Sequence, residues 1–213
     1  VTFNYSLGPL GFLAHSALTA EDGAYPSSGN YGFEDQRFAL EWVQANIAAF
    51  GGDPSNVMLF GESAGGVSTC LHLVAPASEG LFHRAALESG PCEVSRTLAQ
   101  SEAQGSDLAA ATNCDTEPDV PACLRALTPE ALMTALPDDP GLFFGDQASW
   151  GPVVDGLVLL EPAAVTLASG GFHHVPVLLG SNADEGTLFV WLSGLSDIDE
   201  ATYVAMVDAG APA

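Results

Sequence analysis

The sequence contains no lysine, and its four arginines face 27 aspartates and glutamates, which leaves a formal net charge of −23. Binding to nucleic acid or to an anionic membrane surface requires cationic side chains, so this charge excludes those classes of partner. The acidity does not arise from a disordered tail, because 47% of the residues are hydrophobic and only 15% are charged. The composition therefore predicts a globular, acidic chain.

Long apolar runs are also absent. No stretch approaches the ~20 consecutive apolar residues that span a bilayer, so we expect no integral membrane segment. The N-terminus lacks the basic start of a signal peptide, and residues 1–5 predict a strand that begins without a preceding turn. Residues 202–207 predict a helix that ends in the last residues. We expect both ends to be cuts through a larger domain.

The hydrophobic period alternates between strand-like and helix-like. Short apolar runs, suited to strands buried on both faces, alternate with amphipathic segments that predict helices over 33–50 and 64–73. The predicted strands are residues 1–5, 57–60, 85–87 and 175–179. This order is typical of an α/β fold with a mostly parallel central sheet flanked by helices. We expect the sheet to be incomplete at both ends of the chain.

Residues 93–150 interrupt this alternation. They hold ten acidic residues against Arg96 and Arg125, and they predict short helices over 97–112 and 128–135. A connection of this length is best placed as an excursion near the carboxyl ends of the strands. We therefore expect a helical, acidic insertion near the mouth of a site.

The segment Gly61-Glu62-Ser63-Ala64-Gly65 lies between a predicted strand and a predicted helix and fits G-x-S-x-G. In that context the motif predicts a nucleophile elbow, with the Ser63 hydroxyl exposed and the amide of Ala64 directed at an oxyanion. The alternative is a Gly-rich turn with an ordinary serine. Glu62 is either a carboxylate beside the site or half of a buried ion pair with an arginine.

These residues carry a family resemblance. Together with Phe50-Gly-Gly-Asp-Pro54, Glu88-Ser-Gly90, Gly151-Pro-Val-Val-Asp-Gly156 and Gly180-Ser-Asn-Ala-Asp-Glu-Gly-Thr-Leu-Phe189, the elbow closely resembles the carboxylesterase type B family, in the family's order and spacing. The resemblance implies an α/β-hydrolase, of which residues 1–213 are the central part of a single domain. It also implies a Ser–Glu–His triad that needs no metal or organic cofactor and acts on a small-molecule carboxylic ester.

By this resemblance Ser63 is the nucleophile and Glu185 is the acid of the triad. Glu185 follows the predicted strand 175–179, so it leaves the sheet at the same edge as the elbow. Ser89 matches a position that lies near the acid in related proteins and can bond to it. A structural serine at a strand end is the alternative for Ser89.

The base is missing from the sequence. A serine nucleophile requires an imidazole, and in this fold the order is Ser, acid, His, but all five histidines precede Glu185: His15, His72, His83, His173 and His174. The His-Gly-Gly loop that completes the family's oxyanion hole is also absent. We expect both groups to lie outside these 213 residues and the isolated fragment to be inert.

The four cysteines bear on the compartment. Related lipases have a disulfide at the place that matches Cys114 and Cys123, so the resemblance implies a small loop staple there; two free thiols are the alternative. Cys70 is expected to be a buried small apolar residue, and Cys92 has no evident partner. A disulfide implies an oxidising compartment, and hence secretion or an extracytoplasmic location.

The resemblance leaves a second function open. The family includes neuroligin-like adhesion or binding proteins that are catalytically inactive and typically lack the nucleophile. The presence of both Ser63 and Glu185 favours the enzyme. The identity of the ester cannot be read from the sequence.

Overall fold

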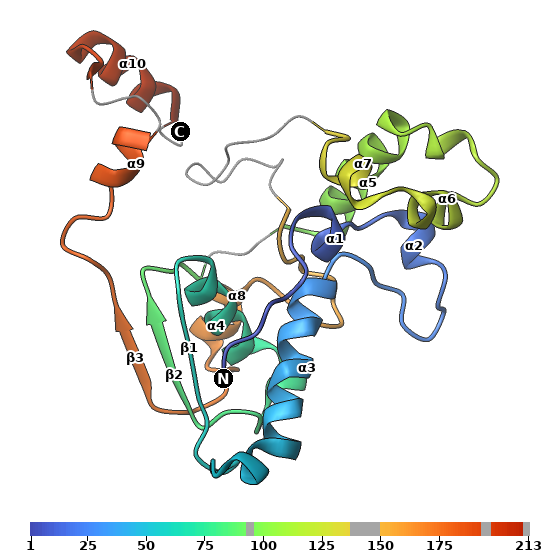
Figure 1. Ribbon diagram of the computed structural model, residues 1–213. Coiled ribbons are helices and arrows are strands. Elements are labelled where there is room, and N and C mark those ends of the chain that lie inside the picture. Colours follow the sequence, from blue (N-terminus) through green and yellow to red (C-terminus); the bar gives the residue numbers. More distant parts are fainter. Residues whose placement is uncertain (93–95, 137–149, 193–196, 211–213) are drawn as a thin grey trace. The chain divides into compact units, whose positions relative to one another are not determined.

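The computed structural model describes residues 1–92, 96–136, 150–192 and 197–210 (Figure 1). The chain divides into two compact units, Val1–Gly180 and Ser181–Ala213. The first unit contains the sheet and most of the helices. The second contains two helices.

The sheet of the first unit is parallel, as predicted. Its strands are β1 (Met58–Glu62), β2 (Arg84–Glu88) and β3 (Val177–Gly180), in the order β1-β2-β3. Glu62 pairs with Glu88, and Glu88 pairs with Gly180, so the three strands end at the same level. The residues that follow them therefore leave the sheet at one edge.

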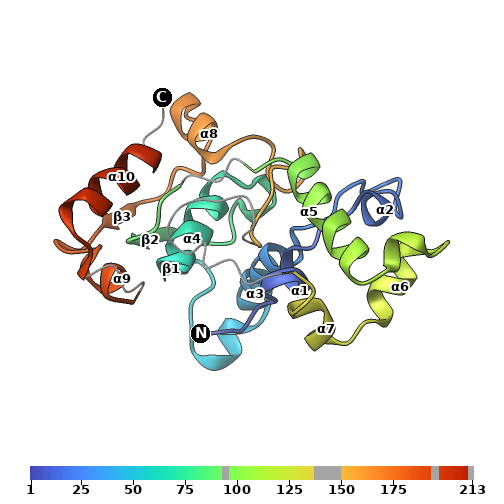
Figure 2. The same cartoon turned by 90° about the horizontal axis from the view of Figure 1, so that it is seen from above.

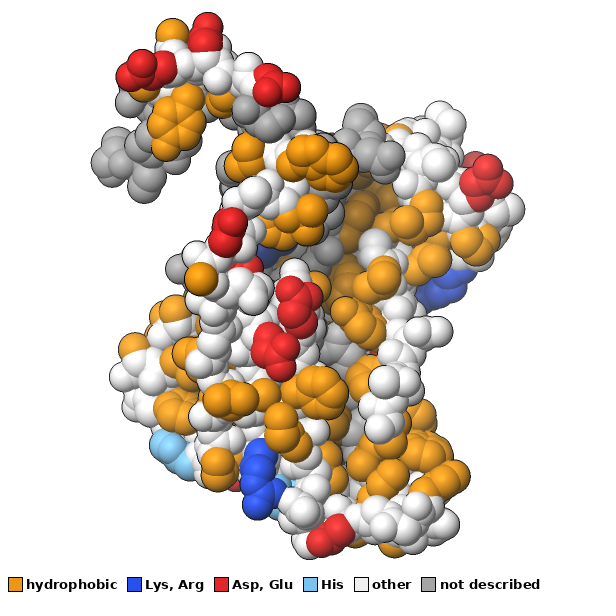
Figure 3. Space-filling view, turned by 60° about the vertical axis from the view of Figure 1, so that its left-hand side comes forward, with side chains coloured by type: hydrophobic (Ala, Val, Ile, Leu, Met, Phe, Trp, Pro, Cys, Tyr) orange, Lys and Arg blue, Asp and Glu red, His pale blue; other side chains and the backbone are white. Residues whose placement is uncertain are grey.

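One face of the sheet carries the core. Leu87 of β2 packs with Leu73 of α4 (Ala64–Val74) and Leu40 of α3 (Tyr31–Asn46) in a buried cluster. The opposite face leaves Phe60 and Leu178 exposed, and Figure 3 shows hydrophobic side chains open at this surface. The prediction of strands buried on both faces is thus wrong for β1 and β3 within the described residues.

The predicted strand at residues 1–5 does not form. This segment is separated from β1 by a groove of about 480 Å³, lined by residues that include Phe3, Leu59 and Gly65. A strand forms only where a neighbouring strand completes its hydrogen-bond ladder, and the groove keeps residues 1–5 out of hydrogen-bond reach of β1. Apolar periodicity at residues 1–5 was a local signal, and it carried no information about the partner.

The predicted helices over 33–50 and 64–73 are confirmed. α3 continues into a 3₁₀ turn, Ile47–Phe50, and stops at Gly51, whose φ of 80° requires the left-handed conformation that glycine adopts freely. α4 contacts β1, β2 and α8 (Ala163–Ser169), so it covers the core face beside the elbow (Figure 2).

The acidic segment after β2 forms three α-helices in its described part: α5 (Leu98–Ala111), α6 (Val120–Ala126) and α7 (Pro129–Met133). The two expected helices correspond to α5 and α7. α6 was not predicted, although its signal is present: Asp119 accepts a hydrogen bond from Ala122 N at 3.0 Å, and a proline follows in the first turn. Residues 93–95 and 137–149 of the predicted insertion lie outside the described residues.

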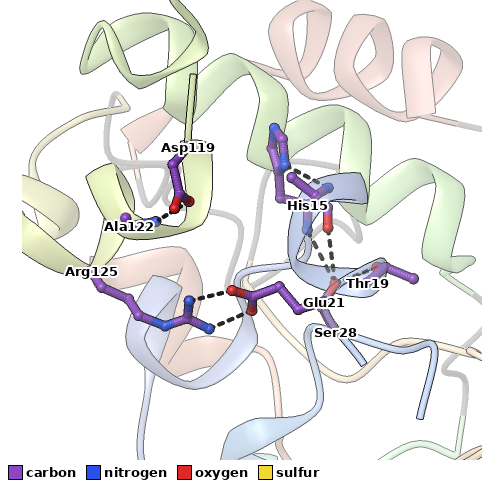
Figure 4. A network of polar contacts seen from close by, with 8 residues as sticks. His15, Thr19, Glu21, Ser28, Asp119, Ala122 and Arg125 are labelled. Carbon is purple, nitrogen blue, oxygen red and sulfur yellow. Dashed lines mark hydrogen bonds and ion pairs between the residues drawn. The ribbon is translucent and has the colours of Figure 1, made fainter. Parts of the chain in front are cut away.

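These helices pack with α1 (Gly8–Phe12) and α2 (Ser16–Thr19) on the side of α3 away from the sheet (Figures 1 and 2). Arg125 of α6 donates two hydrogen bonds of 2.6 Å to Glu21, and Ser28 bonds to Thr19 at 2.7 Å (Figure 4). Gly105 of α5 is pressed on the turn after α1, where a Cβ would lie 1.8 Å from Ala14 O. The acidic helices are therefore packed against, and hydrogen-bonded to, the segment from Ala14 to Glu21.

The second unit contains α9 (Thr187–Leu192) and α10 (Glu200–Gly210). The predicted helix 202–207 lies within α10, and Asp199 caps it by accepting a hydrogen bond from Thr202 N at 2.8 Å. Among the described residues, no helix has the length and apolar character needed to cross a membrane.

Candidate active site

Ser63 occupies the turn between β1 and α4 with φ 54° and ψ −118°. A non-glycine residue with positive φ is uncommon, costs roughly 1 to 3 kcal/mol, and persists only where the surrounding structure holds it. Two backbone hydrogen bonds do so: Ser63 N donates to Glu88 O at 2.9 Å, and Ser63 O accepts from Val67 N at 3.0 Å. The turn has the strained backbone that the motif predicts.

The small residues around Ser63 are required by space. A Cβ on Gly61 would lie 2.3 Å from the carbonyl carbon and oxygen of Gly65, and one on Gly66 would lie 3.0 Å from Glu88 O. A Cβ on Gly90 would lie 2.6 Å from Gly66 Cα. None of these glycines has a positive φ. The turn is therefore tight because backbone meets backbone, and a side chain has no room between them.

Ala64 is the first residue of α4, an 11-residue helix. The amides of the first helical turn have no acceptor within their own helix, and the helix dipole places partial positive charge there. The Ala64 amide is therefore suited to an anionic oxygen beside Ser63. Its role in an oxyanion hole stays a prediction.

Glu62 and Glu88 lie side by side on β1 and β2, directly before Ser63 and Ser89. Glu62 is exposed, and the described residues give it no arginine partner. The buried ion pair considered as an alternative for Glu62 is therefore not formed. The prediction that Glu62 is a carboxylate beside the site stays a prediction.

Ser89 also has a positive φ, of 52°. Its amide donates to Gly180 O at 2.9 Å, and the pairing of Glu62 with Glu88 sets it next to Ser63 at the end of the sheet. Two strained serines thus follow neighbouring strands. Backbone strain of this kind is concentrated at functional sites, which agrees with the predicted role of Ser89 beside Ser63.

Glu185 belongs to the second unit, where it closes a short turn. Asn182 N donates to its Oε1 at 2.6 Å, and Asn182 Nδ2 donates to Oε2 at 3.3 Å. The chain leaves β3 at the edge where Ser63 leaves β1, as expected. Because Ser63 and Glu185 lie in different units, their pairing in a triad stays a prediction.

The comparisons with known proteins agree with this geometry. A sequence profile of the carboxylesterase family matches residues 1–205. The chain belongs to the carboxylesterase family. It is 44% identical over 193 residues to the fumonisin B1 esterase of Sphingopyxis macrogoltabida, covering 89% of this chain and 34% of that protein. To the "crystal protein" of Dictyostelium discoideum it is 40% identical over 215 residues, covering 97% and 36%.

A solved carboxylesterase, EST55 of Geobacillus stearothermophilus, matches with a TM-score of 0.80 and 33% identity, covering 99% of this chain and 44% of that one. The fold is therefore that of an α/β-hydrolase. Mouse cholinesterase is 39% identical over 199 residues, covering 89% of this chain and 31% of that protein. The chain thus spans about a third of the length of these curated relatives.

The histidines of this carboxylesterase-family chain have structural roles. His72 is buried on α4, stacked on Phe33 with the ring centroids 4.2 Å apart. Its Nδ1 bonds to Ser78 Oγ at 2.8 Å and its Nε2 to Gln36 Oε1 at 3.2 Å, so Nε2 carries the proton and Ser78 donates. Burial, and then the nearby positive charge of Arg37, lower the pKa of His72 to about 3. This histidine is a neutral core residue, as expected.

Three of the other histidines bond to the backbone: His15 to Ala17 N, His83 to Val57 N, and His173 to Ala75 O. His174 packs on Phe172. Within the described ranges, no three side chains of the metal-binding types come together. None of the five histidines is therefore brought to Ser63 as a base.

Two disulfides form. The pair Cys114–Cys123 has its Cα atoms 5.5 Å apart and confirms the predicted loop staple. Cys70–Cys92, with 5.7 Å between the Cα atoms, corrects the expectation that Cys70 is a plain buried residue and that Cys92 has no partner. This pairing depends on the topology: α4 packs on β2, which brings Cys70 near Cys92 in the residues that follow β2.

Proposed function

We propose that the protein containing this chain is a carboxylic ester hydrolase that acts through an acyl-enzyme on Ser63. The observation that carries the proposal is the positive φ of Ser63, which is held between a strand and the first turn of α4. Membership of a family whose named relatives include an esterase and a cholinesterase supports it.

The reaction follows from the roles of the residues. Ser63 Oγ attacks the ester carbonyl while its proton passes to an imidazole supplied from outside these 213 residues, with Glu185 orienting that imidazole. The Ala64 amide donates to the carbonyl oxygen as it becomes an oxyanion. The imidazole returns the proton to the departing alcohol. Water then attacks acyl-Ser63, with the imidazole as base, and releases the acid.

Covalent labelling tests the nucleophile. The complete protein should react with a fluorophosphonate at Ser63 and should hydrolyse p-nitrophenyl acetate, and both reactions should vanish in Ser63→Ala. The matched control is Ser68→Ala, five residues further along the chain in α4, which should label and turn over as wild type does. Labelling that persists in Ser63→Ala would place the nucleophile elsewhere. An unlabelled but folded wild type would favour a binding protein.

The fragment offers a second test. These residues supply the nucleophile and one oxyanion donor, but the described part brings no imidazole to Ser63. Residues 1–213 alone should therefore show no Ser63-dependent turnover of p-nitrophenyl acetate. Steady turnover that Ser63→Ala abolishes would contradict the assignment of the base to another part of the protein.

We also propose that the protein acts outside the reducing cytoplasm. The support is the pair of disulfides, since such bonds persist in oxidising compartments. Titration of thiols in the denatured protein, after export into periplasm or medium, should find none of these four cysteines free. Free thiols in active, exported protein would refute the proposal.

A further inference from the structure

Three successive contacts join the nucleophile turn to the segment that follows β2. Ser63 N donates to Glu88 O at 2.9 Å. A helical turn later, the backbone of Gly66 meets the backbone of Gly90, so closely that a Cβ on Gly90 would lie 2.6 Å from Gly66 Cα. Another turn on, Cys70 is bonded to Cys92. The contacts advance together along both segments, as 63 to 88, 66 to 90 and 70 to 92.

These contacts differ in strength. The hydrogen bond and the glycine contact involve only backbone atoms, so no packed side chain at either contact prevents residues 88–92 from shifting along α4. The disulfide is covalent, and its Cys70 end is fully buried among Leu73, Leu87 and other core residues. It is therefore the fixed point of the series.

We propose that the Cys70–Cys92 disulfide is a positioning element for the nucleophile turn. It holds residues 88–92 against the first two turns of α4, which keeps Glu88 O on the Ser63 amide and the strained φ of Ser63 in place. The Ala64 amide starts the same helix and is held with it. The inference rests on the proposed ester hydrolysis, because its consequence is a change in the reactivity of Ser63.

The second disulfide is a matched control within the same chain. Cys114–Cys123 closes a nine-residue step among the acidic helices and belongs to a different core cluster, with Leu108 and Leu124. Its loss should reduce stability without touching residues 63–70 or 88–92. The two bonds therefore separate positioning from general stabilisation.

The experiment compares Cys92→Ala with Cys123→Ala in the complete protein. Cys92→Ala leaves the Cys70 thiol in the core, where it packs as a small apolar residue. At a temperature well below both unfolding midpoints, Cys92→Ala should lower kcat for p-nitrophenyl acetate at least tenfold with KM unchanged. It should also slow fluorophosphonate labelling of Ser63 by a similar factor, while Cys123→Ala changes neither.

Each outcome decides the question. Full kcat and full labelling rate in folded Cys92→Ala would overturn the inference and leave the esterase proposal intact. A wild type that neither labels nor turns over would overturn the esterase proposal itself. If Cys92→Ala does not fold, a Cys70→Ala, Cys92→Ala double variant that keeps native circular dichroism and full kcat would equally overturn the positioning role.

Discussion

The two glycines of the G-x-S-x-G motif should respond in opposite directions to the same added methyl group. A Cβ on Gly61 would lie 2.3 Å from the carbonyl carbon and oxygen of Gly65, whereas a Cβ on Gly65 would meet no described atom within 4 Å other than its chain neighbours and the backbone of its own helix. The perturbations are Gly61→Ala and Gly65→Ala. Both leave Ser63 unchanged.

The magnitude follows from what the methyl group meets. Overpacking a tight site costs typically 1 to 3 kcal/mol. At Gly61 the opposing atoms are backbone, which no rotamer change can move away, so we expect a loss of about 3 kcal/mol. Gly65 is the second residue of α4; alanine is preferred over glycine by roughly 0.5 to 1 kcal/mol in a helix interior, so the free energy of unfolding of Gly65→Ala should rise by up to about that amount.

Urea unfolding of the complete protein measures both changes, with equal denaturant slopes as the condition for comparing midpoints. A Gly61→Ala variant within about 0.5 kcal/mol of wild type would refute the steric argument, since surface substitutions commonly have effects of that size. A loss at Gly65 as large as that at Gly61 would refute the open space assigned to Gly65.

Three further predictions concern stability. Acidification to about pH 5 should lower the free energy of unfolding by about 2 kcal/mol through His72, because the pKa of His72 rises from about 3 towards 6.5 on unfolding and the unfolded chain binds the extra proton. His72→Gln should flatten the dependence of the free energy of unfolding on pH, whereas His174→Gln, at an exposed histidine, should not. Asp155→Ala should cost about 3 kcal/mol in urea, because its carboxylate accepts five hydrogen bonds, three of them from backbone amides. Loss of Cys114–Cys123 by double alanine substitution should cost about 3 kcal/mol, the loop-closure estimate for its nine-residue separation, in thermal or urea unfolding.

The sequence predicted the elbow well because every signal there is local. A strand period, a run of small residues and a helix period follow one another over residues 57–73, and the geometry of the turn depends on that order. The helices α3, α4 and α5 were predictable for the same reason. Their apolar spacing and their end signals lie within each segment.

The features that failed depend on partners distant in the chain. Residues 1–5 have the composition of a strand, but a strand needs a neighbour, and β1 is across a groove. Cys70 and Cys92 are 22 residues apart, and their pairing follows only once α4 is packed on β2. Spacing along the chain could not distinguish this pair from a buried thiol and an unpaired one.

The difference between local signals and contacts distant in the chain also applies to the G-x-S-x-G motif and the residues that hold it in place. The five residues of the motif specify a sharp turn, yet the atoms that hold Ser63 at its φ of 54° include Glu88 O, which lies 25 positions later on the next strand. An oxyanion donor contributes to catalysis when it is fixed before the charge develops, because no energy is then spent on reorienting it. In the proposed ester hydrolysis, the turn at Ser63 and residues 88–92 together would provide this fixed half of the site. In the proposed mechanism the base can come from a separate segment, because Glu185 orients its imidazole, whereas the Ala64 amide takes its direction from the same turn that holds Ser63.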